Sequence, residues 1–197
     1  MIKTTISNCS NTVTQILFEG AEDVLGADKL RDLLAGQRQD DILFSWANAG
    51  PLLRQMEKTY GVAGARGLAQ RIGRAAFKYG VKRFGEQAGI HTPEFRLLPA
   101  PRRIATGLAI LAQVLGDECN DTISVMDSGP YWLWRSERCP VCQDHTSPDP
   151  NCYLVVGLLQ EFTTWAGGGR FYPVTETACR SNGAPACEYR IDKKPLD

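Results

Sequence analysis

The distribution of cysteines is the sequence feature that most limits how this chain can fold. Six of the seven cysteines lie between residues 119 and 187, and five of these follow the spacing Cys139-x2-Cys142-x9-Cys152-x26-Cys179-x7-Cys187. The count is odd, and the N-terminus has no continuous apolar segment of the kind that directs secretion. In a reducing compartment, dense cysteine is more often a metal or catalytic site than a disulfide framework. We therefore expect a cytoplasmic protein whose C-terminal part folds around these thiols.

The C-x-x-C pair at residues 139–142 predicts a metal site. Such a turn after a strand lets two thiolates face one tetrahedral Zn²⁺ at ~2.3 Å. Two further thiols flank a turn near the C-terminus, and Glu176 is a carboxylate that can replace a thiolate as the fourth ligand. The sequence therefore predicts a structural zinc whose candidate ligands are Cys139, Cys142, Glu176, Cys179 and Cys187.

Two other interpretations of the cysteines stay open. One is a redox-active C-x-x-C, although a thioredoxin-type motif belongs at a helix N-terminus in a βαβ unit, which the sequence does not indicate. The other is a set of plain buried thiols. Cys152, at the start of an expected helix, is interpreted as a small core residue or as a thiol whose pKa the helix dipole lowers. Cys9 and Cys119 are interpreted as structural or incidental.

Length and composition predict one globular domain. The chain has 197 residues, and 43% of them are hydrophobic. Its 22 basic and 22 acidic side chains give a formal net charge of zero, so no overall field attracts nucleic acid. The longest apolar stretches, 108–115 and 153–159, are far shorter than the ~20 residues of a membrane span. We expect a single domain over 1–197, with a helical part at about 10–117 and a cysteine-rich sheet part at about 118–192.

Apolar residues recur at helical spacing in the first part of the chain. They predict two short helices within 10–34 that separate at Gly26, and a third helix over about 49–60 that ends at Gly61. A fourth helix is expected over about 62–84, and a fifth from about residue 104 to Gly116.

After residue 117 the pattern changes to short strands with one helix between them. Strands are expected at 122–126, 131–135, 170–177 and 186–191. Asp149 and Pro150 predict the N-cap and first turn of a helix over about 151–166. Helices followed by hairpins predict an α+β fold, in which N-terminal helices pack on a small antiparallel sheet with one inserted helix.

Two tryptophans in one expected strand suggest a ligand-binding face. Alternation along residues 131–134 puts Trp132 and Trp134 on the same side of the sheet, where they either contact an aromatic ligand or pack the core. A basic row on the fourth helix is either a solvated face or a seat for an anionic ligand. The candidates to bind the propionates of a large macrocycle are Arg71, Arg74, Arg102 and Arg103.

The sequence resembles the 4-vinyl reductase domain family. The likeness rests on the cysteine pattern, on Glu176 and on the segments 152–162 and 174–191, and to a lesser degree on segments 60–67 and 71–73. These helical segments are most similar to members linked to bacteriochlorophyll biosynthesis. The resemblance covers residues 10–192.

The resemblance implies an α+β domain that binds small hydrophobic molecules. Relatives serve as sensors of aromatic-responsive transcription activators or act in pigment pathways. Sensor members hold a zinc with cysteines and a glutamate, and a tryptophan near the position of Trp132 contacts their ligand. By position, the zinc ligands correspond to Cys139, Glu176, Cys179 and Cys187, and the additional Cys142 can displace Glu176.

We therefore expect a zinc-stabilised protein that binds a small hydrophobic, aromatic or tetrapyrrole ligand, as a sensor or pigment carrier with no catalytic residues. The alternative is an auxiliary enzyme or 4-vinyl reductase of (bacterio)chlorophyll biosynthesis that takes electrons from a partner. The sequence has no G-x-G-x-x-G or P-loop motif, and its only histidines are His91 and His145. A third hypothesis is a scaffold that forms a homodimer through its helices.

Overall fold

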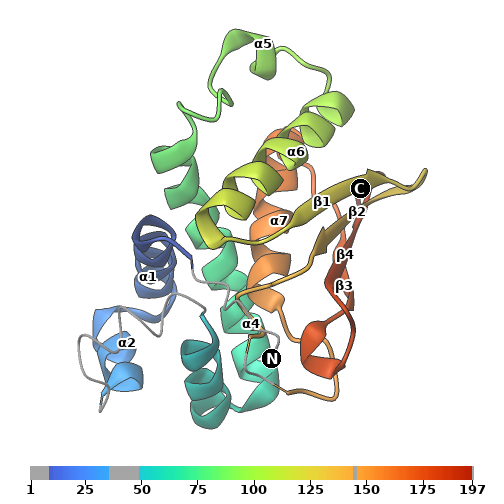
Figure 1. The fold of residues 1–197 in the computed structure, drawn as a ribbon. Helices are drawn as coiled ribbons and strands as arrows, with labels where there is room; N and C mark the ends of the chain where they lie inside the picture. The colour runs from blue at the N-terminus through green and yellow to red at the C-terminus, as the bar shows by residue number, and fades with distance from the viewer. Residues whose placement is uncertain (1–8, 36–48, 144–145, 197) are drawn as a thin grey trace.

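The computed structural model describes residues 9–35, 49–143 and 146–196, so His145 lies outside the described part of the chain. Helices make up the N-terminal part, and four strands with one long helix between them make up the rest (Figure 1). In chain order the elements are α1 (Asn11–Leu25), α2 (Ala27–Leu34), α4 (Gly50–Phe84), α5 (Pro93–Arg96), α6 (Ala100–Cys119), β1 (Ile123–Asp127), β2 (Tyr131–Ser136), α7 (Tyr153–Ala166), β3 (Val174–Ala178), the 3-10 turn η1 (Arg180–Asn182) and β4 (Cys187–Asp192).

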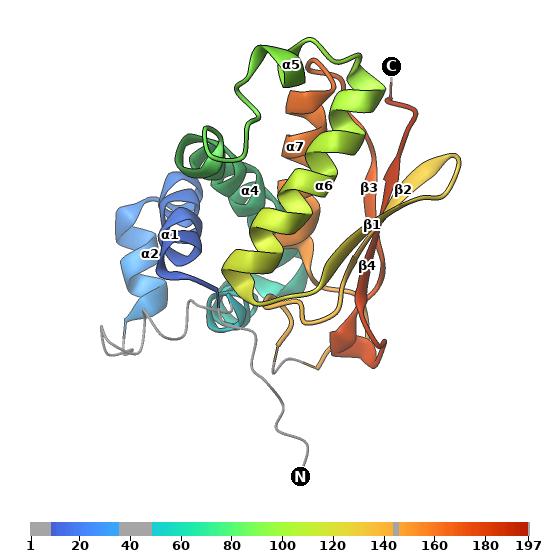
Figure 2. The ribbon, with the colours of Figure 1, turned by 45° about the horizontal axis from the view of Figure 1, so that its top comes forward.

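The four strands form one antiparallel sheet with the order β1-β2-β4-β3. Helices α6 and α7 lie against one face of this sheet, and α4 packs on the other side of α7 (Figure 2). Helices α1 and α2 lie beyond α4, farthest from the sheet. The predicted α+β fold, with helices on an antiparallel sheet and one inserted helix, is confirmed.

Alternation along β2 and β4 decides which side chains face the helices. Trp132 and Trp134 are both buried on that face, as the sequence predicts. Their cross-strand partners in β4 are Ile191 and Tyr189, which are also fully buried. These two pairs form the sheet side of the hydrophobic core.

Helices α4 and α7 cross with their backbones in direct contact. A Cβ on Gly73 would lie 1.9 Å from the carbonyl oxygen of Leu154, and a Cβ on Gly157 would lie 1.9 Å from that of Gln70. Glycine at both positions therefore permits a helix approach that any side chain would block. The crossing fixes where α7 begins relative to α4.

Two predicted helix breaks are confirmed, and both occur at glycines with positive φ. Gly26 (φ 81°) separates α1 from α2. Gly61 (φ 71°) interrupts α4 and divides it into the two helical segments that the sequence predicts. Positive φ costs glycine little, which explains why the chain bends there.

Two predicted helix boundaries are wrong. Helix α6 continues through Gly116 and ends at Asn120, which takes the left-handed conformation (φ 48°) and donates its N–H to the Gly116 carbonyl. Helix α7 begins at Tyr153, with Cys152 rather than Asp149 as the N-cap. The Cys152 N–H is bonded to the Glu176 carboxylate on β3, so a tertiary contact rather than a local cap sets this end.

Cys9 and Cys119 form a disulfide that joins the chain just before α1 to the end of α6. The sequence indicated only a structural or incidental role for these two cysteines, and the disulfide makes that role structural. Neither residue joins the other five thiols. Among the described residues, no helix is long and apolar enough to cross a lipid bilayer.

Candidate functional site

An apolar cavity of about 160 Å³ lies between the helices and the first two strands. Its wall comes from α1, α4, α6, α7, β1 and β2, and from the segment that follows β2. The side chains that contribute most to it are aliphatic and aromatic. Residues on opposite sides of the cavity include Ile16, Phe77, Leu111, Trp134, Leu158 and Phe162.

The cavity has almost no polar surface. Asp121 and Ser136 belong to its wall, but their polar atoms are bonded to each other, and Asp121 also accepts from the Arg138 N–H at 2.7 Å. Burial raises the pKa of Asp121, while those hydrogen bonds act against the shift. The cavity therefore offers apolar contact and a defined shape rather than hydrogen bonds.

Five thiols and one carboxylate gather beside this cavity. The sulfur of Cys152 lies 3.7 Å from that of Cys139, 3.6 Å from that of Cys179 and 4.0 Å from that of Cys187. The Cys187 sulfur lies 3.3 Å from Cys142 and 3.8 Å from Cys179. All five cysteines are buried. We call these five residues and Glu176 the cysteine cluster.

The cluster is assembled from four separate parts of the chain. Cys139 and Cys142 lie in the turn after β2, and Cys152 caps the N-terminus of α7. Cys187 begins β4 directly opposite Ser136 of β2, which brings it to the C-x-x-C turn. Cys179 follows β3. The antiparallel pairing of β2 with β4, and the position of α7, therefore bring the thiols together.

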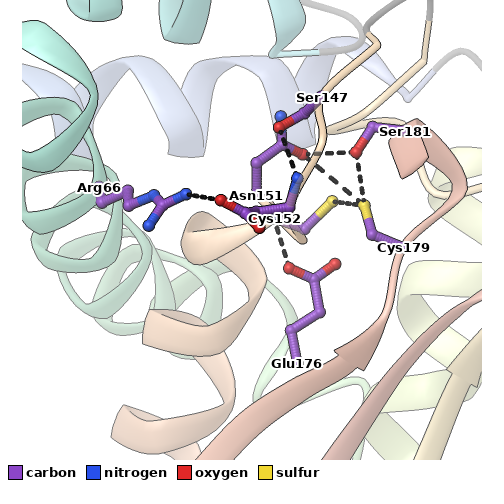
Figure 3. A network of polar contacts seen from close by, with 8 residues as sticks. Arg66, Ser147, Asn151, Cys152, Glu176, Cys179 and Ser181 are labelled. Carbon is purple, nitrogen blue, oxygen red and sulfur yellow. Dashed lines mark hydrogen bonds and ion pairs between the residues drawn. The ribbon is translucent and has the colours of Figure 1, made fainter.

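An irregularity in β3 allows Glu176 and Cys179 to face the same side. Residues three apart in a regular strand point to opposite faces of the sheet. Here the register shifts between Glu176 and Ala178, so the strand has one extra residue relative to β4. As a result the Glu176 carboxylate and the Cys179 thiol both reach the cluster (Figure 3).

Glu176 is only half satisfied by the protein. Its Oε2 accepts the Cys152 N–H at 2.8 Å, whereas its Oε1 is inaccessible to solvent and has no hydrogen-bond partner (Figure 3). Burial and the charge of Cys179 raise its pKa to about 9. A buried carboxyl oxygen without a partner is costly, and a cation beside it would remove that cost.

The thiols affect one another strongly. Hydrogen bonds from neighbouring thiols, Cys142 first among them, lower the pKa of Cys139 and of Cys179. The contact with Cys139 raises the pKa of Cys142, Cys152 and Cys187. Burial raises the pKa of Tyr189, whose hydroxyl is 3.8 Å from the Cys139 sulfur. A lowered thiol pKa favours the thiolate, which is the form of cysteine that binds metal ions.

The sulfur separations fit tetrahedral metal coordination. Zinc–thiolate bonds of ~2.3 Å place neighbouring sulfurs of a tetrahedron ~3.8 Å apart. The separations of 3.3–4.0 Å scatter around that value. Two groups of four could hold an ion, each with all ligand atoms within 4.8 Å of one another. They are Cys139, Cys142, Cys152 and Cys187, and Cys152, Glu176, Cys179 and Cys187.

Sequence reasoning missed Cys152, which belongs to both groups. The position-by-position resemblance assigned Cys139 to the group that contains Glu176, but the structure puts Cys152 in that place. The raised pKa of Cys152 also differs from the lowered one that the sequence suggested for a helix start. Its position just before a helix was the available signal, but only the packing of α7 shows that this helix end meets the cluster.

The structure places the residues predicted to bind a ligand in different environments. Trp134 is 1% exposed and lines the cavity, whereas Trp132 is buried under the Lys193 ammonium, 5.1 Å from its ring centre, and is not part of the cavity wall. Arg71 is exposed and Arg74 binds Glu161 of α7 at 3.2 Å. The structure does not bring either arginine to the cavity.

The basic row on α4 contacts α7 over part of its length. Arg66 binds Asp149 at 3.4 Å and lies over the Tyr153 ring, and Gln70 donates to Gln160 at 2.6 Å. Together with Arg74 these side chains bridge the two helices. The macrocycle candidate Arg103 donates to the Ala166 carbonyl at 2.6 Å and to that of Arg96 at 2.9 Å, where it ties α6 to α7.

The cavity and the cysteine cluster share a wall. Cys139, Pro140 and Val141 line the cavity, and Cys139 is also a member of the cluster. Tyr189 strengthens this connection, because it pairs with Trp134 across the strands and contacts the Cys139 sulfur. The fold and the site thus define an α+β domain with an apolar cavity beside a potential metal centre.

A family comparison identifies the sheet part of this domain. The family model for the 4-vinyl reductase domain matches residues 132–193, which run from β2 to just after β4 and include the whole cysteine cluster. This part of the chain therefore matches the 4-vinyl reductase domain family, in agreement with the resemblance seen in the sequence. No curated protein matches the sequence.

Solved structures share the fold at low sequence identity. An H-NOX protein from S. oneidensis in the Fe(II)NO ligation state superimposes with a TM-score of 0.60 and 12% identity over 95% of this chain and 99% of that chain. An oxygen-binding H-NOX domain related to soluble guanylate cyclases superimposes with a TM-score of 0.54 and 14% identity, over 94% of this chain and 96% of that chain. The phenol-responsive sensory domain of the transcription activator PoxR, solved with phenol, superimposes with a TM-score of 0.53 and 20% identity, over 72% of this chain and 70% of that chain. These similarities extend the α+β assignment over the helical part.

Proposed function

We propose that this protein is a zinc-stabilised binding domain for a small apolar or aromatic molecule, and that it acts as a sensor or carrier. The observation that carries the proposal is the shared wall, in which Cys139–Val141 lines the cavity and Cys139 is also a member of the cysteine cluster. A metal that holds this segment would shape the cavity, and a molecule in the cavity would press on a metal ligand.

The size of the cavity favours a single-ring ligand. A volume of about 160 Å³ is close to the ~150 Å³ of an engineered apolar cavity that binds benzene. It is well below the ~300–1,000 Å³ of pockets that hold drug-sized ligands. A tetrapyrrole is larger still, so the cavity supports the aromatic part of the ligand prediction rather than the tetrapyrrole part. The phenol bound by the PoxR sensory domain is in the same size class.

The cluster favours zinc in a structural role. Four thiolates, or three thiolates and a carboxylate, fill a tetrahedral shell and leave no position for a reactive water. The ion would also supply the missing partner of Glu176 Oε1. Zinc, a cytoplasmic location and a homodimer formed through the helices stay predictions.

Calorimetry with single-ring compounds tests the binding proposal. Toluene and phenol should bind the zinc-loaded protein, whereas a porphyrin should not. Leu111→Trp fills the cavity from α6 and should weaken toluene binding by at least about tenfold, because a filled cavity has no apolar surface left to offer.

Leu97→Trp is the matched control, because Leu97 is 82% exposed and lies outside the cavity wall. This variant should bind toluene as the unmodified protein does. Equal toluene affinity of the Leu111→Trp and Leu97→Trp variants would show that the cavity is not the binding site.

A further inference from the structure

The cysteine cluster has more ligands than one tetrahedral ion can use. One ion takes four ligands, but the cluster offers six groups in two sets of four. We call Cys139, Cys142, Cys152 and Cys187 the thiol set, and Cys152, Glu176, Cys179 and Cys187 the glutamate set. Cys152 and Cys187 belong to both sets.

The present separation of the two shared sulfurs does not favour two ions at once. The sulfurs of Cys152 and Cys187 are 4.0 Å apart. Two ions, each ~2.3 Å from both sulfurs, would be at most ~2.3 Å apart, even on opposite sides of that edge. Metal pairs in two-metal sites are ~3.5–4 Å apart. A pair of ions bridged by these two thiolates would therefore require the Cys152 and Cys187 sulfurs to move well towards each other.

We propose that the cluster is a two-position site for a single metal ion, which keeps Cys152 and Cys187 and exchanges Cys139 and Cys142 for Glu176 and Cys179. The inference rests on the zinc-binding part of the proposed function and adds to it a choice between two ligand sets. In each position the ion binds groups that have no cation beside them when the ion is in the other position. The glutamate set gives Glu176 Oε1 a partner, and the thiol set neutralises the C-x-x-C pair.

The exchange balances in charge and protons. When the ion moves to the glutamate set, the Glu176 carboxyl and the Cys179 thiol give up one proton each, and the released Cys139 and Cys142 thiolates take them up. Both positions combine a doubly charged cation with four anionic ligands, so the net charge of the cluster is unchanged. No oxidant, reductant or outside proton is needed.

Only the thiol set touches the cavity. Cys139 and Pro140 line the cavity, whereas Cys152, Glu176, Cys179 and Cys187 do not. A molecule in the cavity packs against the C-x-x-C turn from the side opposite the ion and so holds Cys139 in place. Occupancy of the cavity therefore favours the thiol set, and the ligand is reported as a change in metal coordination.

Cobalt substitution tests the proposal, because Co²⁺ prefers similar ligands to Zn²⁺ and its absorption reports how many thiolates bind it. The reduced wild-type protein should bind one Co²⁺ with a spectrum between those of two variants. Glu176→Gln should give a four-thiolate spectrum, and Cys139→Ser a spectrum of three thiolates and one oxygen ligand. Each variant should keep Co²⁺ affinity within about tenfold of wild type, because one complete set remains.

A variant of Cys187, which belongs to both sets, provides the comparison with the variants of one set. Cys187→Ser removes a member of both sets and should weaken Co²⁺ binding by at least about a hundredfold. Glu188→Gln, which changes a carboxylate bonded to Arg135 outside the cluster, should keep the wild-type spectrum. Cys142→Ser repeats the test of the thiol set if Cys139→Ser does not fold, as judged by circular dichroism.

Three outcomes would overturn the inference, and a fourth would contradict the proposed function. A second Co²⁺ of comparable affinity would contradict single occupancy. Loss of Co²⁺ from Glu176→Gln or from a folded Cys139→Ser or Cys142→Ser as complete as that from Cys187→Ser would show one fixed ligand set. Toluene should move the wild-type spectrum towards that of Glu176→Gln, and an unchanged spectrum at saturation would disprove the link to the cavity. Failure of the wild-type protein to bind any Co²⁺ would instead remove the metal from the proposed function.

Discussion

The cavity and the cysteine cluster lie side by side, but they are built in opposite ways. The cavity is space left between regular helices and strands, and many apolar side chains each contribute a little to its wall. The cluster is made by six side chains from a turn, a helix cap, a bulged strand end and the first residue of β4. The first tolerates gradual change in shape, whereas the second depends on a few directional ligands.

This difference indicates that the two sites are suited to different roles. Apolar contact discriminates weakly between molecules of similar size, since one methylene changes affinity by about 1–3 kcal/mol. Metal–thiolate bonds are strong and require defined geometry. The cavity is therefore suited to contact with small molecules of similar size, and the cluster is suited to holding the surrounding segments in defined arrangements.

The largest effect is expected from the cluster. With zinc bound, Cys187→Ser should lower the free energy of unfolding by about 3–5 kcal/mol, because it removes a ligand that no other thiol replaces. Urea denaturation measures this loss. After treatment with a chelator the difference between variant and wild type should fall below about 1 kcal/mol. Identical urea midpoints in the presence of zinc would mean that the cluster holds no stabilising metal.

The second-largest effect on stability is expected at the crossing of α4 and α7. Gly73→Ala places a Cβ against the Leu154 carbonyl and should cost about 2–4 kcal/mol of stability, since backbone must move. Gly67→Ala, on the same helix with open space around its Cβ, should instead stabilise the protein by up to about 1 kcal/mol. Thermal unfolding of the two variants compares them directly. Similar melting temperatures would show that α4 and α7 do not pack so closely.

A smaller effect is expected from the link between the two sites. Removing zinc should weaken toluene binding by about tenfold, because the Cys139–Val141 wall loses its support. Titration calorimetry with and without a chelator measures this coupling. In Cys139→Ser the wall no longer depends on the ion, so chelation should change toluene affinity by less than about twofold. Equal affinity of the wild-type protein in both conditions would show that the sites act independently.

The smallest effect is expected at the α4 surface. Arg74→Ala removes a partly exposed ion pair with Glu161 and should cost less than about 0.5 kcal/mol, because solvent screens it. Toluene affinity should not change, since Arg74 lies outside the cavity wall. A tenfold weaker affinity in calorimetry would instead favour a ligand site between α4 and α7.

Local patterns predicted much of this molecule. Helical periodicity located α1, α2, α4 and α6, and alternation placed Trp132 and Trp134 on the buried face of the sheet. These signals depend on neighbours within a few residues, so the sequence alone carries them. The C-x-x-C pair and the short spacing from Glu176 to Cys179 are equally local, and these residues do lie together in the structure.

The remaining features depend on how distant segments pack. Cys152 joins the cluster because α7 docks on α4 through Gly73 and Gly157, and nothing next to Cys152 in the sequence indicates this. The sequence suggested Arg74 as a ligand-binding group because its ion-pair partner, Glu161, lies on another helix and is not visible near Arg74 in the sequence. The cavity itself is unfilled space, which no residue pattern encodes.

The close crossing of α4 and α7 also bears on how the ligand preference of this domain can change. Because two glycines bring those backbones together, side chains there have no freedom to vary, and the position of the Cys152 ligand depends on them. The cavity residues Ile110, Leu111, Val114 and Leu115 lie on α6, which contributes no member of the cluster. Substitutions on α6 can therefore change the shape of the cavity while the cluster keeps its geometry, so that the proposed ligand site can diversify independently of the proposed metal site.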